Sequence, residues 1–364
     1  MIATVAWMVL IFTALQFVVA MVNLLYRKRI PTGTVPPAEE VSVLVPARNE
    51  VRNIPALLHD LLESDYKPLE IIVCDDHSTD GTGELVRELA RKHPSVRLIR
   101  SEPLPLGWLG KNFACWQLAR EARGKYLLFL DADVRLEPPC IGRALWFVRQ
   151  HGLGLLSIFP RQVMKSWGEK MTVPLMNYIL LTLLPLRCVR EAKEYPSLAA
   201  ANGQFMFFDA AVYRRTQPHD AMRGEKAEDI AIARNYKKQG IPVACLAADK
   251  GVSCRMYTGL AEAVCGFGRN VRNFFGDSFL LALLFWFITT FGFVFVYLAF
   301  PLSVFWGFVL LWLAVRVPVS LTSGQSVAEN LLLCIPQQLC LGVILMWGVA
   351  GEYLIPQQWK GRVI

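Results

Sequence analysis

The apolar residues of this 364-residue chain are concentrated in blocks at its two ends. One block runs from residue 4 to residue 26 without a formal charge, and three more occupy residues 278–300, 302–313 and 330–350. They raise the hydrophobic share of the chain to 54%, above the roughly 45–50% that is usual for soluble chains. The blocks predict membrane-spanning segments on both sides of a middle that has the composition of a soluble protein.

The first block is long enough to cross a bilayer, which takes about 20 residues. Arg27, Lys28 and Arg29 follow it directly. A cleaved signal peptide would carry its basic residues before the apolar stretch and a small-residue cleavage site after it, so residues 1–29 are interpreted as a retained anchor. Because positive charge stays on the cytoplasmic side, the residues after Arg29 are expected in the cytoplasm.

The three later blocks predict a membrane region over residues 278–350. Pro301 separates the first two of them and suits a tight turn, whereas Pro336 lies inside the third, which is either a kinked span or a re-entrant hairpin. Three full crossings would place the C-terminus outside, but Lys360 and Arg362 favour the inside. With the anchor, these blocks predict a multi-pass protein of the plasma membrane whose catalytic middle faces the cytoplasm.

A shorter apolar segment, residues 172–186, has basic residues on both sides. It is too short to span a bilayer comfortably. Two interpretations remain open: a helix that lies in the membrane interface, or a buried core helix.

Short apolar runs alternate with helical patterns between residues 40 and 150. The runs, at residues 41–45, 69–73, 96–99 and 126–130, are rich in Val, Ile and Leu and predict buried strands. Strands and helices in alternation predict an α/β fold with a doubly wound, mostly parallel sheet. Ligands of such sheets bind beyond the carboxyl ends of the strands.

Polar clusters follow three of these predicted strands. They are residues 46–50 (PARNE), 75–81 (DDHSTDG) and 131–133 (DAD). One Asp at a strand end is often a turn or helix-capping residue, but three clusters at one sheet edge indicate a binding site. Since the chain has neither G-x-G-x-x-G nor G-x-x-x-x-G-K-[ST], the pattern favours a metal-assisted nucleotide site over a dinucleotide or P-loop site.

The spacing of Asp131 and Asp133 suits a divalent cation. Mg²⁺ typically keeps one or two protein carboxylates and takes its other ligands from water and substrate phosphates. These two residues therefore predict a site for a nucleoside diphosphate. Asp75 or Asp76 would accept hydrogen bonds from a ribose or a base edge.

In this order the motifs resemble those of the family 2 glycosyltransferases with the GT-A fold. Residues 224–229 (GEKAED) are similar to that family's acidic third motif, and the resemblance covers roughly residues 40–275. Further details are similar to the membrane-bound branch that glucosylates carotenoids and hopanoid-type lipids: residues 104–111 (LPLGWLGK), His219 ahead of Glu228 and Asp229, and residues 254–257 (CRMY).

The resemblance implies a role for each matched residue. On the donor side, Asp133 would be the principal ligand of Mg²⁺ or Mn²⁺, with Asp131 toward the donor sugar or ribose and beside the metal. Asp229 would act as the base that takes the proton of the acceptor hydroxyl, and the reaction would invert the anomeric carbon. The remaining donor residues would be Pro46, Arg48 and Glu50 in the nucleotide pocket, Asp75 or Asp76 at uridine, and Lys111 near the diphosphate.

Two of these roles have structural alternatives. Asp229 would also be favourable simply as an acidic residue in the first turn of a helix, where it complements the helix dipole. His219 either orients phosphate or acceptor, or caps a loop.

The sequence departs from the family near residue 273. Processive members carry Q/R-x-x-R-W there, whereas residues 269–273 read RNVRN, with Asn273 in the Trp position. Arg269 and Arg272 remain able to neutralise diphosphate, or to anchor the chain at anionic headgroups. Without the Trp, and with three later apolar blocks, transfer of a single sugar is favoured over extrusion of a polymer.

The predicted function is inverting, metal-dependent transfer of one hexose, glucose by resemblance, from a UDP-sugar to a membrane lipid such as a carotenoid or another isoprenoid lipid. The alternatives are a polyprenyl-phosphate or ceramide-type glycosyltransferase and a catalytically silent membrane scaffold. A transporter is disfavoured because, beyond Arg316 and Glu329, the apolar blocks hold almost no ionisable residues. The formal net charge of +8 is interpreted as attraction to headgroups and diphosphate, with no nucleic-acid partner.

Overall fold

The computed structural model describes residues 1–26, 38–67, 69–248, 250–353, 358–359 and 362–363. The chain forms two compact units, each assembled from separate segments. The sheet unit comprises Lys28–Arg161 and Leu186–Cys254, and the helical unit comprises Met1–Arg27, Gln162–Pro185 and Arg255–Ile364.

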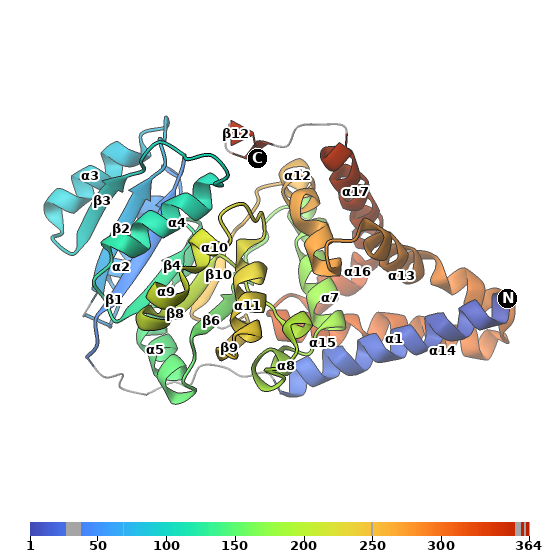
Figure 1. The fold of residues 1–364 in the computed structure, drawn as a ribbon. Coiled ribbons are helices and arrows are strands. Elements are labelled where there is room, and N and C mark those ends of the chain that lie inside the picture. The colour runs from blue at the N-terminus through green and yellow to red at the C-terminus, as the bar shows by residue number, and fades with distance from the viewer. Residues whose placement is uncertain (27–37, 68, 249, 354–357, 360–361, 364) are drawn as a thin grey trace. The chain divides into compact units, whose positions relative to one another are not determined.

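A seven-stranded sheet in the order β3-β2-β1-β4-β8-β6-β9 forms the centre of the sheet unit (Figure 1). The first four strands of this order are parallel, β8 runs antiparallel to both of its neighbours, and β6 and β9 are parallel to each other. The sheet is therefore mostly parallel, as predicted, and the four predicted strands are confirmed. The strands are β1 (Val41–Ala47), β2 (Leu69–Asp75), β3 (Val96–Arg100), β4 (Tyr126–Leu130), β6 (Leu155–Phe159), β8 (Phe205–Asp209) and β9 (Val243–Ala247).

The central strands are apolar on both faces because helices cover them. All five residues of β4 and five successive residues of β1 are buried. Helix α4 packs on β1 and β2, where it crosses them in Figure 1. The helices of this unit are α2 (Ile54–Leu62), α3 (Thr82–Lys92), α4 (Gly110–Glu121), α5 (Cys140–Gln150), α8 (Leu186–Glu191), η1 (Pro196–Leu198), α9 (Ala210–Thr216), α10 (Pro218–Ala221) and α11 (Glu228–Lys238).

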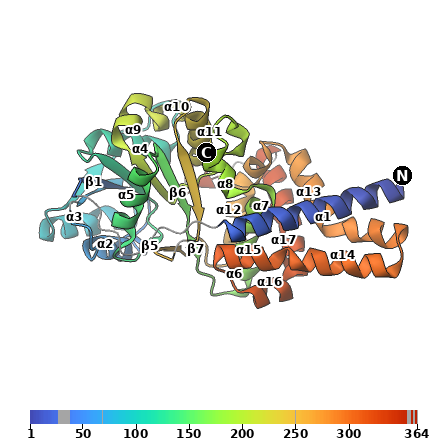
Figure 2. The same ribbon diagram turned by 90° about the horizontal axis from the view of Figure 1, so that it is seen from below.

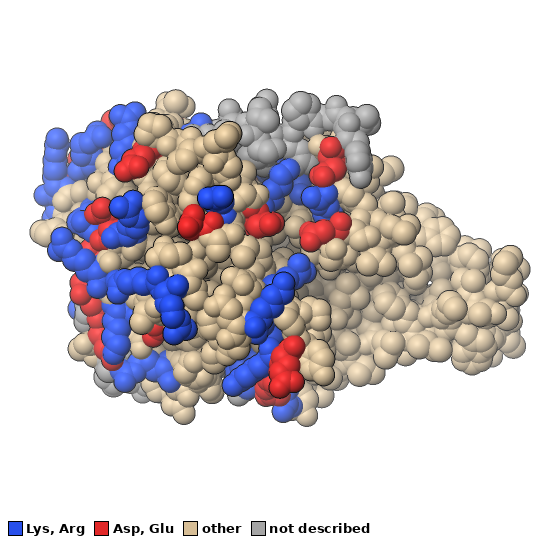
Figure 3. All heavy atoms as spheres, in the orientation of Figure 1, with Lys and Arg blue, Asp and Glu red and all other residues tan. Residues whose placement is uncertain are grey.

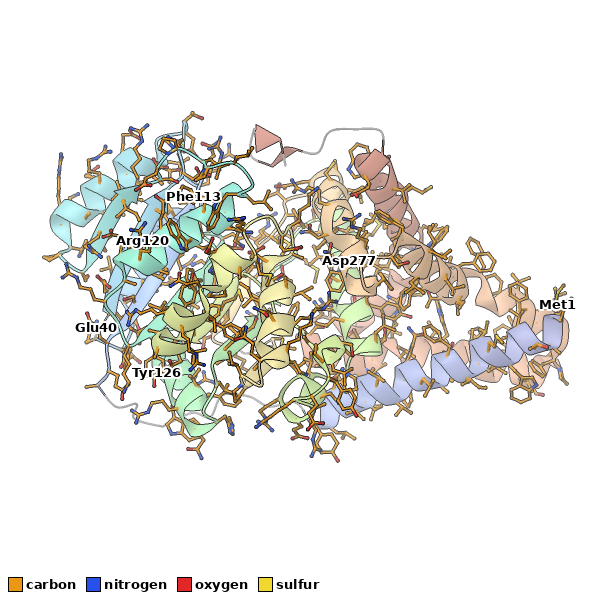
Figure 4. All side chains as sticks on the ribbon, viewed as in Figure 1. Met1, Glu40, Phe113, Arg120, Tyr126 and Asp277 are labelled. Atoms are coloured by element: carbon orange, nitrogen blue, oxygen red, sulfur yellow. The ribbon has the colours of Figure 1, made fainter. Side chains whose placement is uncertain are left out.

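The amino ends of β1 and β4 lie together, which places their carboxyl ends at the opposite edge of the sheet. Glu40 O accepts from Tyr126 N at 3.3 Å, and both residues are labelled in Figure 4. The polar clusters at residues 48–50, 75–76 and 131–133 therefore share one edge. Three further strands are short. Strand β5 (Val134–Leu136) pairs antiparallel with β10 (Val252–Cys254), and β7 is Arg161–Gln162.

Among the described residues, four helices of the helical unit are long and apolar enough to cross a membrane: Ile2–Leu25, Phe279–Ala299, Leu302–Ser323 and Cys334–Glu352. They match the four predicted blocks. Helix α1 packs against α13, α14 and α15, and Figures 1 and 2 both show it beside the latter two. The elements of this unit are α1 (Ile2–Leu25), α6 (Trp167–Thr172), α7 (Pro174–Leu183), α12 (Leu260–Asn270), η2 (Val271–Phe275), α13 (Phe279–Ala299), α14 (Leu302–Ala314), α15 (Arg316–Ser323), α16 (Val327–Leu332), α17 (Cys334–Tyr353), β11 (Gln358–Trp359) and β12 (Arg362–Val363).

Two prolines lie where long helices of this unit begin. Pro301 caps the start of α14, as predicted for a tight turn. Pro336 is the third residue of α17, in the first turn, where proline leaves no intrahelical hydrogen bond unmade. From Cys334 onward the last block is therefore one continuous helix, and of the two interpretations the re-entrant hairpin is wrong.

The face of the helical unit shown in Figure 3 is uncharged along the long apolar helices. Neither α1 nor α13 nor α14 contains Lys, Arg, Asp or Glu. The residues on which the predicted orientation depends, Arg27, Lys28, Arg29 and Lys360, lie outside the described residues, so the cytoplasmic orientation stays a prediction.

The segment at residues 172–186 forms α7, which is buried within the helical unit. Asn23 of α1 donates to the carbonyls of Leu181 and Leu184, both at 2.9 Å, and Gln16 donates to Thr182 at 3.2 Å. These contacts favour the buried-helix alternative over the interfacial one, because the apolar face of α7 packs against protein.

Candidate active site

The loops after β1 and β2 are tied together by hydrogen bonds. Arg48 Nη1 donates to Asp76 O at 2.6 Å and lies 3.8 Å from its carboxylate, and Asn49 N donates to Ser78 Oγ at 3.0 Å. Asn49 and His77 both have positive φ, so each loop turns sharply at its strand end. These turns hold Arg48 and Asp76, two of the predicted nucleotide residues, in contact.

Asp80 fixes the outer part of the same loops. Its carboxylate accepts from Val51 N at 3.1 Å and from Thr82 Oγ1 at 2.6 Å, while Glu50 N donates to Thr82 Oγ1 at 2.8 Å. Burial opposes ionisation of Asp80, but the hydrogen bonds from Thr82 and Val51 outweigh it and lower the pKa of Asp80. Through Thr82, Asp80 thereby positions Glu50. The sequence analysis named Asp75 and Asp76 of the same cluster as candidate site residues, but not Asp80.

The carboxylate of Asp75 lies so close to Gly83 that a larger residue at position 83 would not fit. Asp75 Oδ1 accepts from Ser78 N at 3.1 Å, and a Cβ atom on Gly83 would lie 2.8 Å from Asp75 Oδ2. The other predicted pocket residue of this region, Pro46, belongs to β1 and pairs in register with Cys74.

Lys111 lies in the first turn of α4 and faces two carboxylates. Its Nζ is 3.0 Å from Asp131 Oδ1 and 3.2 Å from Glu228 Oε1. Burial disfavours the charged amine, but the two carboxylates outweigh it and raise the pKa of Lys111 above its ordinary value. Lys111 is therefore a fixed cation of the kind that binds diphosphate oxygens.

Asn112 brings the start of α4 to the loop before α11. Its Nδ2 lies within 2.9–3.2 Å of the carbonyl oxygens of Met222, Arg223 and Glu225, and Leu109 N donates to Arg223 O at 2.9 Å. The side chain is 1% exposed. These bonds place Lys111 and the acidic motif of residues 228–229 together, although they are far apart in the sequence.

Asp229 lies in the first turn of α11, as the helix alternative required. Its Oδ2 accepts from Gly203 N and its Oδ1 from Ile230 N, both at 2.8 Å. Burial, and after it the charge of Glu228, raises the pKa of Asp229 to about 7 against the opposing charge of Lys111. A carboxylate with such a pKa can accept a proton near neutral pH, as a general base must.

Asp133 is a half-buried carboxylate with one buried oxygen that has no hydrogen-bond partner in the described part of the chain. Gln204 Nε2 donates to Asp133 Oδ2 at 3.4 Å, whereas Oδ1 is buried without a hydrogen bond. Burial, and after it the charge of Asp131, raises the pKa of Asp133 to about 7. A divalent cation would satisfy this oxygen and favour the charged form.

No group of three or more His, Cys, Asp or Glu side chains in the described part of the chain is arranged as a metal cage. A cation of the Mg²⁺ or Mn²⁺ type typically keeps only one or two protein carboxylates and takes its other ligands from water and phosphate oxygens. Asp133 and Asp131 fit such an ion by the chemistry of their donor atoms.

His219 lies in a buried aromatic cluster. It is 1% exposed, its Nδ1 lies 2.7 Å from Tyr213 Oη, and its ring centroid is 4.8 Å from that of Phe129. Burial, and after it the charge of Lys111, lowers the pKa of His219 to about 3. The imidazole is therefore neutral and its contacts are packing contacts; its predicted role toward phosphate or acceptor stays a prediction.

Arg269 and Arg272 belong to the helical unit. Arg269 is in the last turn of α12, and Arg272 Nη1 lies 2.6 Å from Glu352 Oε1. Their predicted role at the diphosphate stays a prediction.

Three residues of the site escaped the sequence analysis: Gly203, Gln204 and Asn112. None lies in a strand-end cluster, and each acts through a backbone or amide hydrogen bond across the fold. The available signal for a site residue was the pair Gly203 and Gln204 directly before the apolar run of β8. Polar residues at the start of a buried strand have to be accommodated at the sheet edge.

Replacement of Gly203 by Ala is expected to weaken binding of UDP about tenfold. A Cβ atom would lie 2.9 Å from Lys111 Nζ and 3.2 Å from Glu228 Oε1, so Lys111 has to leave its position between the carboxylates. Calorimetric titration with UDP measures the effect. The control Gly259→Ala adds a methyl group where no atom lies within 4 Å, and equal affinities in the two variants would contradict the prediction.

Residues 42–216 match the model of glycosyl transferase family 2. Over 221 residues, the chain is 28% identical to the 4,4'-diaponeurosporenoate glycosyltransferase of Staphylococcus haemolyticus strain JCSC1435, covering 60% of this chain and 57% of the relative. The enzyme of the same name from Staphylococcus aureus strain USA300 is 26% identical, with 60% and 56% covered. The chain thus spans less than two thirds of the length of these relatives.

Among solved structures, a mannosyltransferase from Pyrobaculum calidifontis in complex with GDP-mannose and Mn²⁺ has the same fold. The TM-score is 0.56 at 18% sequence identity, and the match covers 97% of this chain and 99% of that one. The mostly parallel α/β sheet is thus of the GT-A type, as the sequence motifs predicted.

Proposed function

We propose that the chain transfers one hexose from a UDP-sugar to a membrane lipid such as a carotenoid or another isoprenoid lipid, because residues 42–216 match the model of glycosyl transferase family 2. The observation that carries the proposal is the grouping of cationic Lys111 and half-buried Asp229 around Gly203. One is suited to a diphosphate and the other to an acceptor proton. Glucose is the proposed hexose.

On the donor side, the loops after β1 and β2 bind the nucleoside. Arg48, Glu50 and one of Asp75 or Asp76 contact the base and ribose, while Lys111 binds the diphosphate in place of its present carboxylate partners. Asp133, with Asp131, would hold Mg²⁺ or Mn²⁺, and such an ion would supply positive charge near the diphosphate.

The transfer is a displacement with inversion. An acceptor oxygen forms a bond to the anomeric carbon as the bond from that carbon to the diphosphate oxygen breaks. If the acceptor is a hydroxyl, its proton passes to Asp229, which the N–H groups of Gly203 and Ile230 hold in place. A positioned base of this kind is typically worth about 10²- to 10⁴-fold in rate.

The proposed acceptor class is supported by the relatives, which are named 4,4'-diaponeurosporenoate glycosyltransferases, a name that denotes a carboxylate. A carboxylate acceptor is already ionised at neutral pH, since its ordinary pKa is near 4. It would need Asp229 less than a hydroxyl does. The four apolar helices support an enzyme that is anchored in a membrane, and the sheet unit is proposed to lie in the cytoplasm.

Transfer to a hydroxyl acceptor is expected to rise with pH between about 6 and 8. The ionised form of Asp229 is the active base, and its pKa of about 7 means that protonation removes this form as the pH falls. The rate should fall about tenfold per pH unit below that pKa and level off above it. A pH profile of kcat at saturating metal measures this. A flat profile with a hydroxyl acceptor would contradict the role of Asp229.

The proposal is tested with the full chain in lipid nanodiscs, radiolabelled UDP-glucose and Mn²⁺. A hydroxylated carotenoid, a carotenoid carboxylic acid, ceramide and a polyprenyl phosphate are compared as acceptors, and GDP-mannose is compared as donor. Label is expected in the carotenoid fraction with UDP-glucose. Label in polyprenyl phosphate or ceramide alone would show that this lipid, and not a carotenoid, is the acceptor. No label in any lipid would refute the proposal.

A further inference from the structure

Arg316 is a buried cation within a membrane-spanning helix. It starts α15, inside the apolar segment Leu302–Ser323, and is 2% exposed. A charged side chain at such a position is costly and almost always has a charged or polar partner. We therefore expect a charged or polar partner for the guanidinium of Arg316.

The contacts of Arg316 use one part of its guanidinium. Nη1 donates to Gln337 Oε1, and the group lies 4.3 Å from the ring centroid of Tyr178 and 5.9 Å from that of Trp312. Nε and Nη2 are buried, and in the described part of the chain neither has a hydrogen-bond partner.

Two other arginines show what this edge of a guanidinium binds. Arg135 donates from Nε and Nη2 to the two carboxylate oxygens of Asp60, at 2.6 and 2.7 Å. Arg255 donates from the same two nitrogens to Glu169, at 3.2 and 2.9 Å. Two parallel N–H groups match the two oxygens of a carboxylate or phosphate. Arg316 presents the same pair without the oxyanion.

The neighbouring amides make no hydrogen bond to Nε or Nη2 in the described part of the chain. Gln337 Nε2 donates to Asn330 Oδ1 at 2.9 Å and to Lys170 O at 3.0 Å, which fixes Gln337 Oε1 toward Arg316. Asn330 Nδ2 in turn donates to Ser320 Oγ and to Gln325 Oε1. Each side-chain carbonyl of the chain of amides already accepts a bond, and the Nε2 of Gln325 is a further buried donor without a partner.

The described carboxylates of the helical unit that form ion pairs are paired with other cations. Glu169 binds Arg255, Glu329 binds Lys170 at 2.7 Å, and Glu352 binds Arg272. Water could satisfy the N–H groups of Arg316 but would leave the positive charge uncompensated in an apolar surrounding.

We infer that the Nε and Nη2 edge of Arg316 binds the oxyanion, carboxylate or phosphate, of an amphiphilic lipid. The apolar helices around it favour a ligand that brings a hydrocarbon body with its anionic group, over a free ion. The rings of Tyr178 and Trp312 lie near the planar guanidinium and hold it in position. Its edge is therefore preformed for two parallel hydrogen bonds.

The test compares retinoic acid with retinol, which share a polyene body and differ in the head group. Binding to the full chain in neutral detergent is followed by quenching of tryptophan fluorescence, without donor nucleotide, so the outcome is independent of the proposed transfer reaction. We expect the acid to bind on the order of 10- to 100-fold tighter than the alcohol. The preference should disappear in Arg316→Gln and shrink in Arg316→Lys, which keeps the charge without the fork.

Competition then identifies the oxyanion. Displacement of retinoic acid by phosphatidic acid and not by phosphatidylcholine assigns a phosphate head group, and resistance to both assigns a carboxylate. The matched control is Arg135→Met, since that arginine's edge is already occupied by Asp60. Equal binding of acid and alcohol by the wild-type chain, an acid preference retained in Arg316→Gln, or equal displacement by inorganic phosphate would overturn the inference; the wild-type comparison decides even if the variants do not fold.

Discussion

Asp229→Asn is expected to lower kcat for a hydroxyl acceptor by about 10²- to 10⁴-fold while donor binding is retained. The amide cannot take the proton that Asp229 accepts, but its shape preserves one oxygen for the N–H of Gly203 or Ile230. With a carboxylate acceptor the same change should cost much less, because no proton has to be removed. Steady-state kinetics with both acceptor classes therefore measures the base and the acceptor chemistry together.

The control for this variant is Asp209→Asn. Asp209 caps α9 by accepting from Val212 N at 3.0 Å, and Asn caps helices about as well as Asp. Its kinetics should match those of the wild type. Loss of donor affinity in Asp229→Asn, in place of a loss in kcat, would contradict the assignment of Asp229 as base.

Asp133→Asn is expected to abolish the part of UDP binding that depends on Mn²⁺ or Mg²⁺. The wild-type sheet unit should be stabilised by UDP with metal by about 2.7 kcal/mol when the free ligand is near 100 times its Kd. In the variant, UDP should stabilise equally with and without metal, because the buried carboxylate oxygen that fits a cation has lost its charge. Thermal unfolding with UDP, with metal and with both measures these differences.

The ligand-free Asp133→Asn protein should be at least as stable as the wild type at neutral pH. Burial raises the pKa of Asp133 to about 7, well above that of an exposed carboxyl, so its ionised form destabilises the fold increasingly as the pH rises from about 4 to 7. Asp60→Asn is the matched control, since it removes a carboxylate that pairs with Arg135 outside the site. A metal-dependent shift that survives in Asp133→Asn would show that Asp133 is not the principal ligand.

The strands of the first half of the sheet were predictable because parallel strands covered on both faces are written as continuous apolar runs. The strand-end clusters followed from the same topology, and the structure places Arg48 and Asp76 in contact there. The long apolar helices were predictable from length and hydropathy alone. Pro336 was ambiguous because a proline is tolerated in a first helical turn, and the start of α17 was not evident in the sequence.

The parts that were missed depend on contacts between distant segments. Gly203 binds Asp229 through a backbone N–H, and Asn112 joins α4 to the loop before α11 through three carbonyls. Neither Gly203 nor Asn112 is of a residue type that signals function in a sequence. Similarly, Arg316 could be read as lying near the end of a span, but its unpartnered edge depends on four segments of the helical unit.

The most direct test of the central claim is mass spectrometry of membrane lipids from cells that make a carotenoid, with and without this chain and with isotope-labelled glucose. A carotenoid or other isoprenoid lipid that carries one labelled hexose is predicted with the wild-type chain and not with Asp133→Asn. Identical lipid profiles with the wild-type chain and without it would contradict the account.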